Sequence, residues 1–298
     1  MATEPAELVT DPARVRAILA DPEYRVPPAP SVPADETGTL GWLRAHVARF
    51  CDGEVHDRRR ELVERELARL DPAGLRTAAA DLARGELAVA GREPFDAMGI
   101  ARRVPVAVLA EALGVALAAT GRAVEAVLDS ASGYPNPDVA GPGADAGVRF
   151  LAEVLSAGDH GPAGPEEVAN RIGLLEQACD ATAALIGNAL ITAFADPAGD
   201  GDGADLDSDA VIATTIVTEP PVQRTRRLSP DGEPVTLDIT SCTFGAGRRP
   251  CPGADQATAL AAGVLDALLG ACELADQQLS YLPSPNLRVP QELLVTTR

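Results

Sequence analysis

The ten residues Phe244–Gly253, which read FGAGRRPCPG, constrain the fold of this chain more than any other segment. Gly245 and Gly247 permit backbone angles that are closed to other residues, so the loop can wrap closely around a ligand. A proline on each side stiffens the chain at Cys251. A lone cysteine in a loop is more often structural. However, a helical pattern follows directly, its N-terminus would stabilise a thiolate, and Arg249 can neutralise a carboxylate. The segment therefore suits a single thiolate ligand to a flat, metal-bearing cofactor.

Most of the remaining sequence has helical periodicity, which predicts a mainly α fold with a minor β part. Aromatic residues make up only 3% of the chain, so the core must be built from Leu, Val, Ile and Ala. The length of 298 residues allows one large helical domain, and we find no linker or internal repeat. Helices are expected at Asp11–Ala20, Leu40–Leu70 (with a break near Asp52-Gly53), Leu75–Ala90, Val106–Leu117, Gly121–Leu128, Gly147–Ala157, Glu166–Phe194 and Ala254–Leu274. Strands are expected at Val211–Val217 and Val235–Ile239.

The charge of the chain limits its partners. Acidic residues outnumber basic ones by 44 to 25, which gives a net charge of −19. This argues against nucleic acid or an anionic membrane surface, because both require clustered positive charge. We see no signal-peptide pattern and no membrane-spanning stretch, so we expect a cytoplasmic protein. Five cysteines without a CxxC pair favour neither a zinc site nor a disulfide framework, and they fit a reducing compartment.

The cysteine loop resembles the haem-binding signature of the cytochrome P450 superfamily, F-x-x-G-x-R-x-C-x-G. The five fixed positions are matched by Phe244, Gly247, Arg249, Cys251 and Gly253. The resemblance implies haem b, iron protoporphyrin IX, as the cofactor, with Cys251 as the axial ligand of the metal. It also implies that Phe244 shields the sulfur, that Arg249 binds a haem propionate, and that Gly253 lets the next helix approach the porphyrin.

Two further segments resemble propionate-binding parts of the same superfamily. His56 and Arg60 lie four residues apart and so share one helix face, like the His and Arg of the P450 C-helix. Such a charged run usually marks a solvated face, and we favour propionate binding because a haem beside the cysteine loop would require cations. Pro220–Arg227 resembles the segment after the P450 K-helix. There Arg227, with Arg226 as the second choice, would reach a propionate.

The segment Ala183–Leu190 aligns with the distal I-helix of actinobacterial P450s, just after the place where an acid and a Thr lie over the haem. Asp180 keeps the acid and is a candidate proton source. The Thr is replaced by Ala181, and Thr182 lies one position further on, about 100° around the helix. The resemblance therefore implies Asp180 and Thr182 as candidate catalytic residues and Ala178 as a cofactor contact. The changed Thr predicts atypical oxygen activation, with peroxide-driven chemistry as one option.

The implied fold is a reduced cytochrome P450 fold. The window of the K-helix E-x-x-R motif reads Thr214–Val217, most of the meander ahead of Phe244 is missing, and so are N-terminal elements. Losing the motif together with the meander leaves no buried charge without its partner. We therefore expect a single P450-like haem domain over 1–298. It would be helix-rich over 1–195, with the K-region, the cysteine loop, the L-helix and a terminal β-hairpin in 210–298.

The resemblance implies a haem-thiolate oxidoreductase, a monooxygenase or peroxygenase that oxidises a small organic molecule in specialised metabolism. An acidic ferredoxin or another electron donor would dock on the cysteine side, on a basic patch of Arg58, Arg59 and Arg248. Arg58, Arg59, His46 and His160 are expected at the surface. The alternative is a P450-like helper that stabilises another biosynthetic enzyme and has little oxidase activity of its own; a haem-based sensor is a third reading. The reduced substrate pocket is expected to be either open to solvent or closed by a second subunit of an oligomer or by a partner enzyme.

Overall fold

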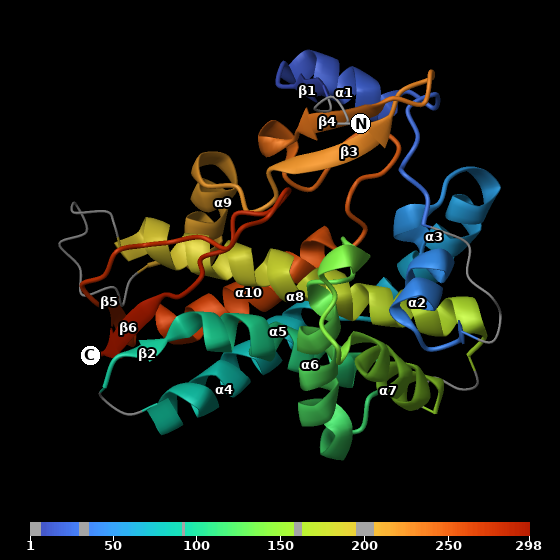
Figure 1. Cartoon of the computed structure of the whole chain (residues 1–298). Helices are drawn as coiled ribbons and strands as arrows, with labels where there is room; N and C mark the ends of the chain where they lie inside the picture. Colours follow the sequence, from blue (N-terminus) through green and yellow to red (C-terminus); the bar gives the residue numbers. More distant parts are fainter. Residues whose placement is uncertain (1–6, 30–35, 91–92, 158–162, 195–205) are drawn as a thin grey trace.

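The computed structural model describes residues 7–29, 36–90, 93–157, 163–194 and 206–298 (Figure 1). Within these residues the α-helices are α1 (Pro12–Ala20), α2 (Leu40–His46), α3 (Gly53–Leu67), α4 (Pro72–Ala90), α5 (Ala97–Ala112), α6 (Leu117–Ala131), α7 (Ala144–Ser156), α8 (Pro165–Phe194), α9 (Ser208–Thr218) and α10 (Ala254–Leu268). The strands are β1 (Glu7–Val9), β2 (Phe95–Asp96), β3 (Arg224–Leu228), β4 (Pro234–Asp238), β5 (Cys272–Leu274) and β6 (Leu294–Thr297). The predicted fold class, mainly α with a minor β part, is confirmed.

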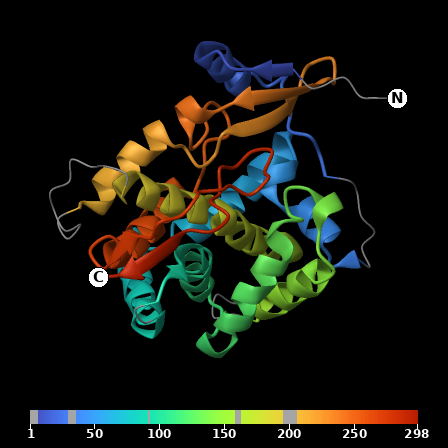
Figure 2. The same ribbon diagram turned by 60° about the vertical axis from the view of Figure 1, so that its left-hand side comes forward.

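The long helix α8 runs through the centre of the helical body, and α5, α6 and α10 pack against it (Figures 1 and 2). Its buried residues extend from Val168 to Leu190 and lie on all sides of the helix, as expected inside a core. Nearby, α10 crosses α4 so closely that a Cβ on Gly263 would lie 2.2 Å from the Arg76 carbonyl oxygen. No helix in the described part of the chain is long and apolar enough to cross a membrane.

Two small sheets lie on either side of this helical body (Figure 1). One has the strand order β1-β4-β3, with β1 parallel and β3 antiparallel to β4. The other is antiparallel, with the order β2-β6-β5, and lies near the C-terminus. The first sheet packs with α1 around a small apolar core of its own, formed by Val9, Val15, Ile18, Leu19, Val235, Leu237 and Ile239. This unit supports the loop that carries the cysteine motif.

Most of the predicted helices are confirmed, including the break before α3, but one predicted strand is wrong. Val211–Val217 lies in α9, whose N-terminus is capped by the side chain of Asp207. Val211 and Thr215, four residues apart, are buried on one face of this helix. Capping and burial outweigh the modest cost of β-branched residues in a helix. The strand predicted at Val235–Ile239 is confirmed as β4.

Candidate functional site

The loop that carries Cys251 connects the first sheet to α10 and is held by backbone contacts. The Cys251 N–H donates to the Phe244 carbonyl at 2.7 Å. Gly245 and Gly247 have φ angles of +75° and +67°, in the left-handed region that favours glycine. A Cβ on Gly247 would lie 2.4 Å from the Leu19 carbonyl oxygen near the end of α1. Gly247 therefore packs the loop against α1 at a position with no space for a side chain.

The thiol of Cys251 lies among protein atoms, although the residue as a whole is open to solvent. The residue is exposed, yet burial raises the pKa of its thiol. A hydrogen bond from the Gly253 backbone and the charges of Arg60 and Arg49 lower the same pKa. Since α10 begins at Ala254, the N-terminal end of a helix adjoins the thiol and favours its ionised form. The pKa of this thiol is raised on balance, so a metal that binds the sulfur would displace its proton.

Arg227 on β3 is a buried cation with few negative neighbours. It is 8% exposed, and burial, together with the charge of Arg249, lowers its pKa to about 10. Asp52 acts in the opposite direction, but this carboxylate already forms a 2.7 Å ion pair with Arg249. Arg49 adds a further positive charge to the group. Three arginines around one aspartate leave positive charge unbalanced, which fits the two carboxylates of a haem.

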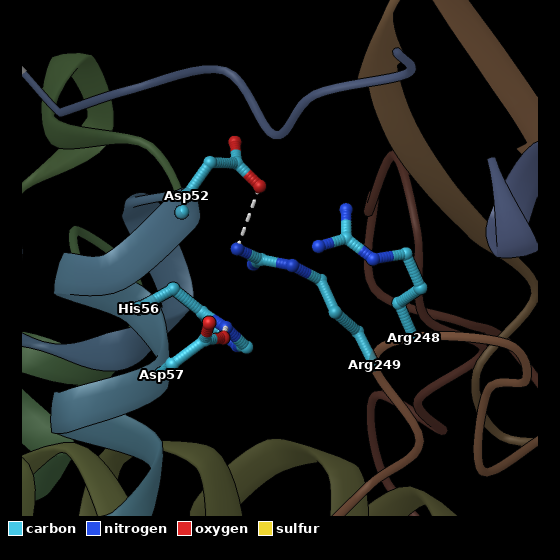
Figure 3. Close-up of a pocket in the computed structure, with 6 residues that line it drawn as sticks. Asp52, His56, Asp57, Arg248 and Arg249 are labelled. Atoms are coloured by element: carbon cyan, nitrogen blue, oxygen red, sulfur yellow. Dashed lines mark hydrogen bonds and ion pairs between the residues drawn. The ribbon is translucent and has the colours of Figure 1, made fainter. Parts of the chain in front are cut away.

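His56 and Arg60 lie one turn apart on α3, and both adjoin the cysteine loop. Arg60 Nη1 donates to the Pro250 carbonyl at 2.8 Å. Burial lowers the pKa of His56, and Arg249 lowers it further, although Asp57, with Oδ1 3.0 Å from His56 Nδ1, raises it. Figure 3 shows Arg249 reaching from the loop towards Asp52 at the start of α3. A small hollow of about 80 Å³ lies between the two elements, lined by Asp52, Gly53, His56, Asp57, Arg248 and Arg249.

The middle of α8 contains an accessible stretch. Gln177 is exposed and Ala178 and Ala181 are half-buried, whereas the helix is buried before and after them. Arg49 Nη1 donates to Gln177 Oε1 at 3.1 Å, and Arg49 also acts electrostatically on Cys251. The accessible stretch and the thiol therefore border the same region.

The two predicted catalytic residues have different surroundings. The side chain of Asp180 is 35% exposed, and its Oδ1 lies 3.9 Å from Arg102 Nε on α5. Burial raises the pKa of Asp180, and Arg102 opposes this shift. Thr182 is only 2% exposed and lies within the core. Asp180 therefore borders the accessible stretch of α8 and Thr182 does not; both roles stay predictions.

Arg58 and Arg59 do not form the predicted basic patch with Arg248. Arg59 is 7% exposed, so the prediction that it lies at the surface is wrong. Its Nε donates to Glu166 Oε1 at 2.9 Å, and Arg58 Nη2 donates to the same atom at 2.7 Å. Glu166, in the first turn of α8, therefore pairs with the positive charges of both Arg58 and Arg59. The sequence around the two arginines does not reveal this distant partner. Of the predicted patch, Arg248 is an exposed cation on the cysteine loop.

The histidines outside the site include one corrected prediction. His46, expected at the surface, is half-buried because its ring packs against Trp42, with the ring centroids 5.3 Å apart. Its Nδ1 also lies 2.8 Å from the Trp42 carbonyl oxygen. His160 lies outside the described residues.

Arg49 and Asp52 were not predicted as members of the site. They precede α3 in a short connection, next to the helix that carries His56. The charges of Arg49 and Asp52 do not by themselves indicate that the two residues belong to the site. Their partners Gln177, Arg227 and Arg249 lie more than 100 residues away in the sequence. A search for charged residues just ahead of the His56 helix would have raised both as candidates.

No protein-family model matches the sequence, and no curated protein does so either. Solved structures do match. P450BioI, in complex with an acyl carrier protein that carries hexadec-9Z-enoic acid, aligns over 99% of this chain and 93% of its own, with a TM-score of 0.80 and 18% identity. The P450 heme domain of Tepidiphilus thermophilus aligns over 97% and 88%, with a TM-score of 0.78 and 17% identity. CYP154A1 of Streptomyces coelicolor aligns over 97% and 91%, with a TM-score of 0.72 and 22% identity. The chain thus has the cytochrome P450 fold, as the sequence predicted.

Proposed function

We propose that this protein is a haem-thiolate oxidoreductase of the cytochrome P450 type that oxidises a small organic molecule. The position of Cys251 carries the proposal. The residue is exposed, and its thiol adjoins the N-terminus of α10 and has Arg49 and Arg60 close by. The accessible stretch of α8, which includes Ala178 and Ala181, borders the same region. Cys251 would be the axial ligand of the haem iron.

Five basic side chains lie near the cysteine loop and are candidates for binding the two propionates of haem b: Arg49, His56, Arg60, Arg227 and Arg249. Three of them already contact a carboxylate, since Arg60 pairs with Glu64 at 2.6 Å, Arg249 with Asp52 at 2.7 Å and His56 with Asp57 at 3.0 Å. Arg227 is the best placed of them because it is buried and its Nη1 donates to neutral acceptors, Thr225 Oγ1 and the Arg226 carbonyl. A carboxylate beside Arg227 would gain a charge-assisted hydrogen bond and would relieve the mutual repulsion of the arginines. Arg60, which holds the Pro250 carbonyl, also positions the cysteine loop.

The remaining predicted contacts follow from their places in the fold. Phe244, half-buried at the start of the loop, would shield the sulfur, and Gly253, the N-cap of α10, would allow close approach to the ring. Ala178 would lie against the ring from α8. The haem, when bound, supplies the activation of dioxygen or peroxide. Asp180 would hold and release a proton at the distal side, while Arg102 favours its ionised form.

The proposal also includes the cellular compartment, the electron donor and the class of substrate. The five cysteines are all unpaired, which favours a reducing, cytoplasmic compartment. An acidic ferredoxin would dock over the exposed cysteine loop and Arg248. Because Arg58 and Arg59 are paired with Glu166, fewer basic residues are available to guide it than the sequence predicted. The substrate belongs to specialised metabolism in this proposal.

The absorption spectrum tests this function. We expect the purified protein to bind haem and its reduced CO complex to show the Soret band typical of thiolate ligation. Cys251→Ser should abolish this band, because a serine hydroxyl is not a thiolate ligand. The matched control Cys242→Ser, in the segment leading into the same loop, should keep it. An unchanged spectrum in Cys251→Ser would disprove thiolate ligation, and a colourless protein that co-purifies with a biosynthetic enzyme would support the helper alternative.

A further inference from the structure

Glu176 lies beside the accessible stretch of α8, and the proposed function does not use it. It is 4% exposed. Its Oε1 contacts the Ser130 hydroxyl on α6, and its Oε2 is buried without a hydrogen-bond partner among the described residues. An unpartnered oxygen is far more costly on a buried carboxylate than on a neutral carboxylic acid. The surroundings of Glu176 therefore favour the protonated group.

The contacts of Ser130 point to the same protonation state. Its Oγ lies 2.8 Å from the Ala126 carbonyl oxygen as well as next to Glu176 Oε1. A serine hydroxyl has a single proton, and the carbonyl can only accept. With an ionised Glu176, the hydroxyl donates to either the carboxylate or the Ala126 carbonyl, and the other contact has no proton. With a protonated Glu176, the carboxyl group can donate to Ser130 Oγ while the hydroxyl donates to Ala126, so both contacts have a proton.

The charged groups around Glu176 come from three elements. Burial raises its pKa to about 8, the hydrogen bond from Ser130 opposes this rise, and Asp180 on the same helix adds to it by repulsion. Tyr134, just after α6, interacts with Glu176 and is itself 2% exposed, with a pKa that burial raises strongly. Arg49 and Arg44 act on Tyr134 from the segment around α2. Among the described groups that act on Glu176, none is a cation that would favour its ionised form. Asp180 differs, because Arg102 favours the ionised form of that carboxyl group.

Glu176 and Asp180 form a pair with opposite surroundings. They lie four residues apart on α8, so their side chains are neighbours on one face, with Cβ atoms roughly 5–6 Å apart. Glu176 points into the core between α6 and α8, whereas Asp180 is partly exposed and faces Arg102. When the surroundings of two neighbouring carboxyl groups make their pKa values differ, one group can act as the acid and the other as the base.

We propose that Glu176 is a proton store for Asp180. No hydrogen bond joins the two carboxyl groups among the described residues, so one side chain must first turn towards the other. The proton then leaves the carboxyl O–H of Glu176 and binds to a carboxylate oxygen of Asp180, which leaves Glu176 ionised and Asp180 neutral. When Asp180 has released that proton at the distal side and taken another from solvent, the reverse transfer refills Glu176. The use of this store in turnover rests on the proposed function; the state of the two carboxyl groups does not.

Infrared spectroscopy tests the store without any reaction. The protein should show the C=O band of a protonated carboxyl group near pH 7, and the band should disappear as the pH is raised through about 8. Glu176→Gln should remove this band, whereas the matched control Glu153→Gln, at an exposed position on α7, should keep it. Asp180→Asn should shift the midpoint of the titration to lower pH, because it removes a negative neighbour. A band that survives in Glu176→Gln, or a midpoint that Asp180→Asn leaves unchanged, would overturn the proposal.

A kinetic test then addresses the use of the store, with hydrogen peroxide as oxidant and guaiacol as the reductant probe. Glu176→Gln keeps a donor for Ser130 but has no acidic proton. Its rate should fall roughly tenfold or more, and its solvent isotope effect should rise. The loss of rate above about pH 8 that we expect in the wild type should be absent from this variant. An unchanged rate and pH profile in a haem-loaded variant would refute the store. Failure to bind haem would instead refute the proposed function, and the infrared titration would still decide the state of Glu176.

Discussion

Arg227 and Glu176 are both ionisable side chains inside the protein, and the structure treats them in opposite ways. Arg227 stays a cation, crowded by Arg249 and Arg49, with Asp52 as the carboxylate nearby. Glu176 is held neutral by burial and by the negative charge of Asp180. A charge that is kept in spite of repulsion needs a ligand of the opposite sign, and an acid that is kept neutral holds a proton in reserve.

At this scale we predict that Arg227→Gln weakens haem binding. The change removes one charge-assisted hydrogen bond, so the dissociation constant for haem should rise about tenfold or more. The stability of the protein without haem should stay the same or increase, because a buried and repelled cation has been removed. Titration with haem and denaturant unfolding measure the two effects. Arg226→Gln, at an exposed position on the same strand, is the control, and an equal loss of affinity in both variants would contradict the role of Arg227.

At the scale of elements, α8 is connected to both the end of α9 and the C-terminal segment. Asn188 on α8 donates to the carbonyls of Glu219, at the end of α9, and Arg288, in the C-terminal segment, at 3.2 and 3.1 Å. Arg288 also forms a 3.0 Å ion pair with Glu219. These contacts fix the end of α9 and the C-terminal segment against the central helix.

The packing of the cysteine loop on α1 gives a prediction at the same scale. Gly247→Ala should destabilise the protein by more than Gly232→Ala, although both glycines have positive φ angles. Gly232, between β3 and β4, has open space around its Cβ position, so its substitution should cost about 1–2 kcal/mol of backbone strain. Gly247 would add a collision with the Leu19 carbonyl. Denaturant unfolding compares the two, and similar losses in both would show that the loop can move away from α1.

At the scale of the whole molecule, the stability should depend on pH through the buried carboxyl groups. The pKa of Glu176 is raised from 4.5 to about 8, so between these values the folded chain binds a proton that the unfolded chain has lost. The contribution is fully present below about pH 4.5 and is lost as the pH rises through about 8. Asp180, whose pKa is also raised, acts in the same direction.

We therefore predict that the free energy of unfolding falls with rising pH in this window, by up to about 1.4 kcal/mol per pH unit from Glu176. Glu176→Gln should flatten the dependence, so the variant gains stability relative to the wild type as the pH rises. Denaturant unfolding of both proteins at several pH values, with Glu153→Gln as the control, checks this. Parallel curves for wild type and Glu176→Gln would contradict a neutral Glu176.

The sequence by itself determined the helical character of the chain, the glycine conformations of the cysteine loop and the match of that loop to the P450 signature. These are local properties, set by backbone geometry and by residue spacing within one segment. Only the tertiary structure decided that Val211–Val217 is a helix, that Arg59 is buried against Glu166, and that Arg49 binds Gln177 on α8. The burial and charge state of Glu176 are of the same kind. In each case the partner comes from a distant part of the chain or from another helix, and the energy of a charge or an apolar face depends on what surrounds it in space.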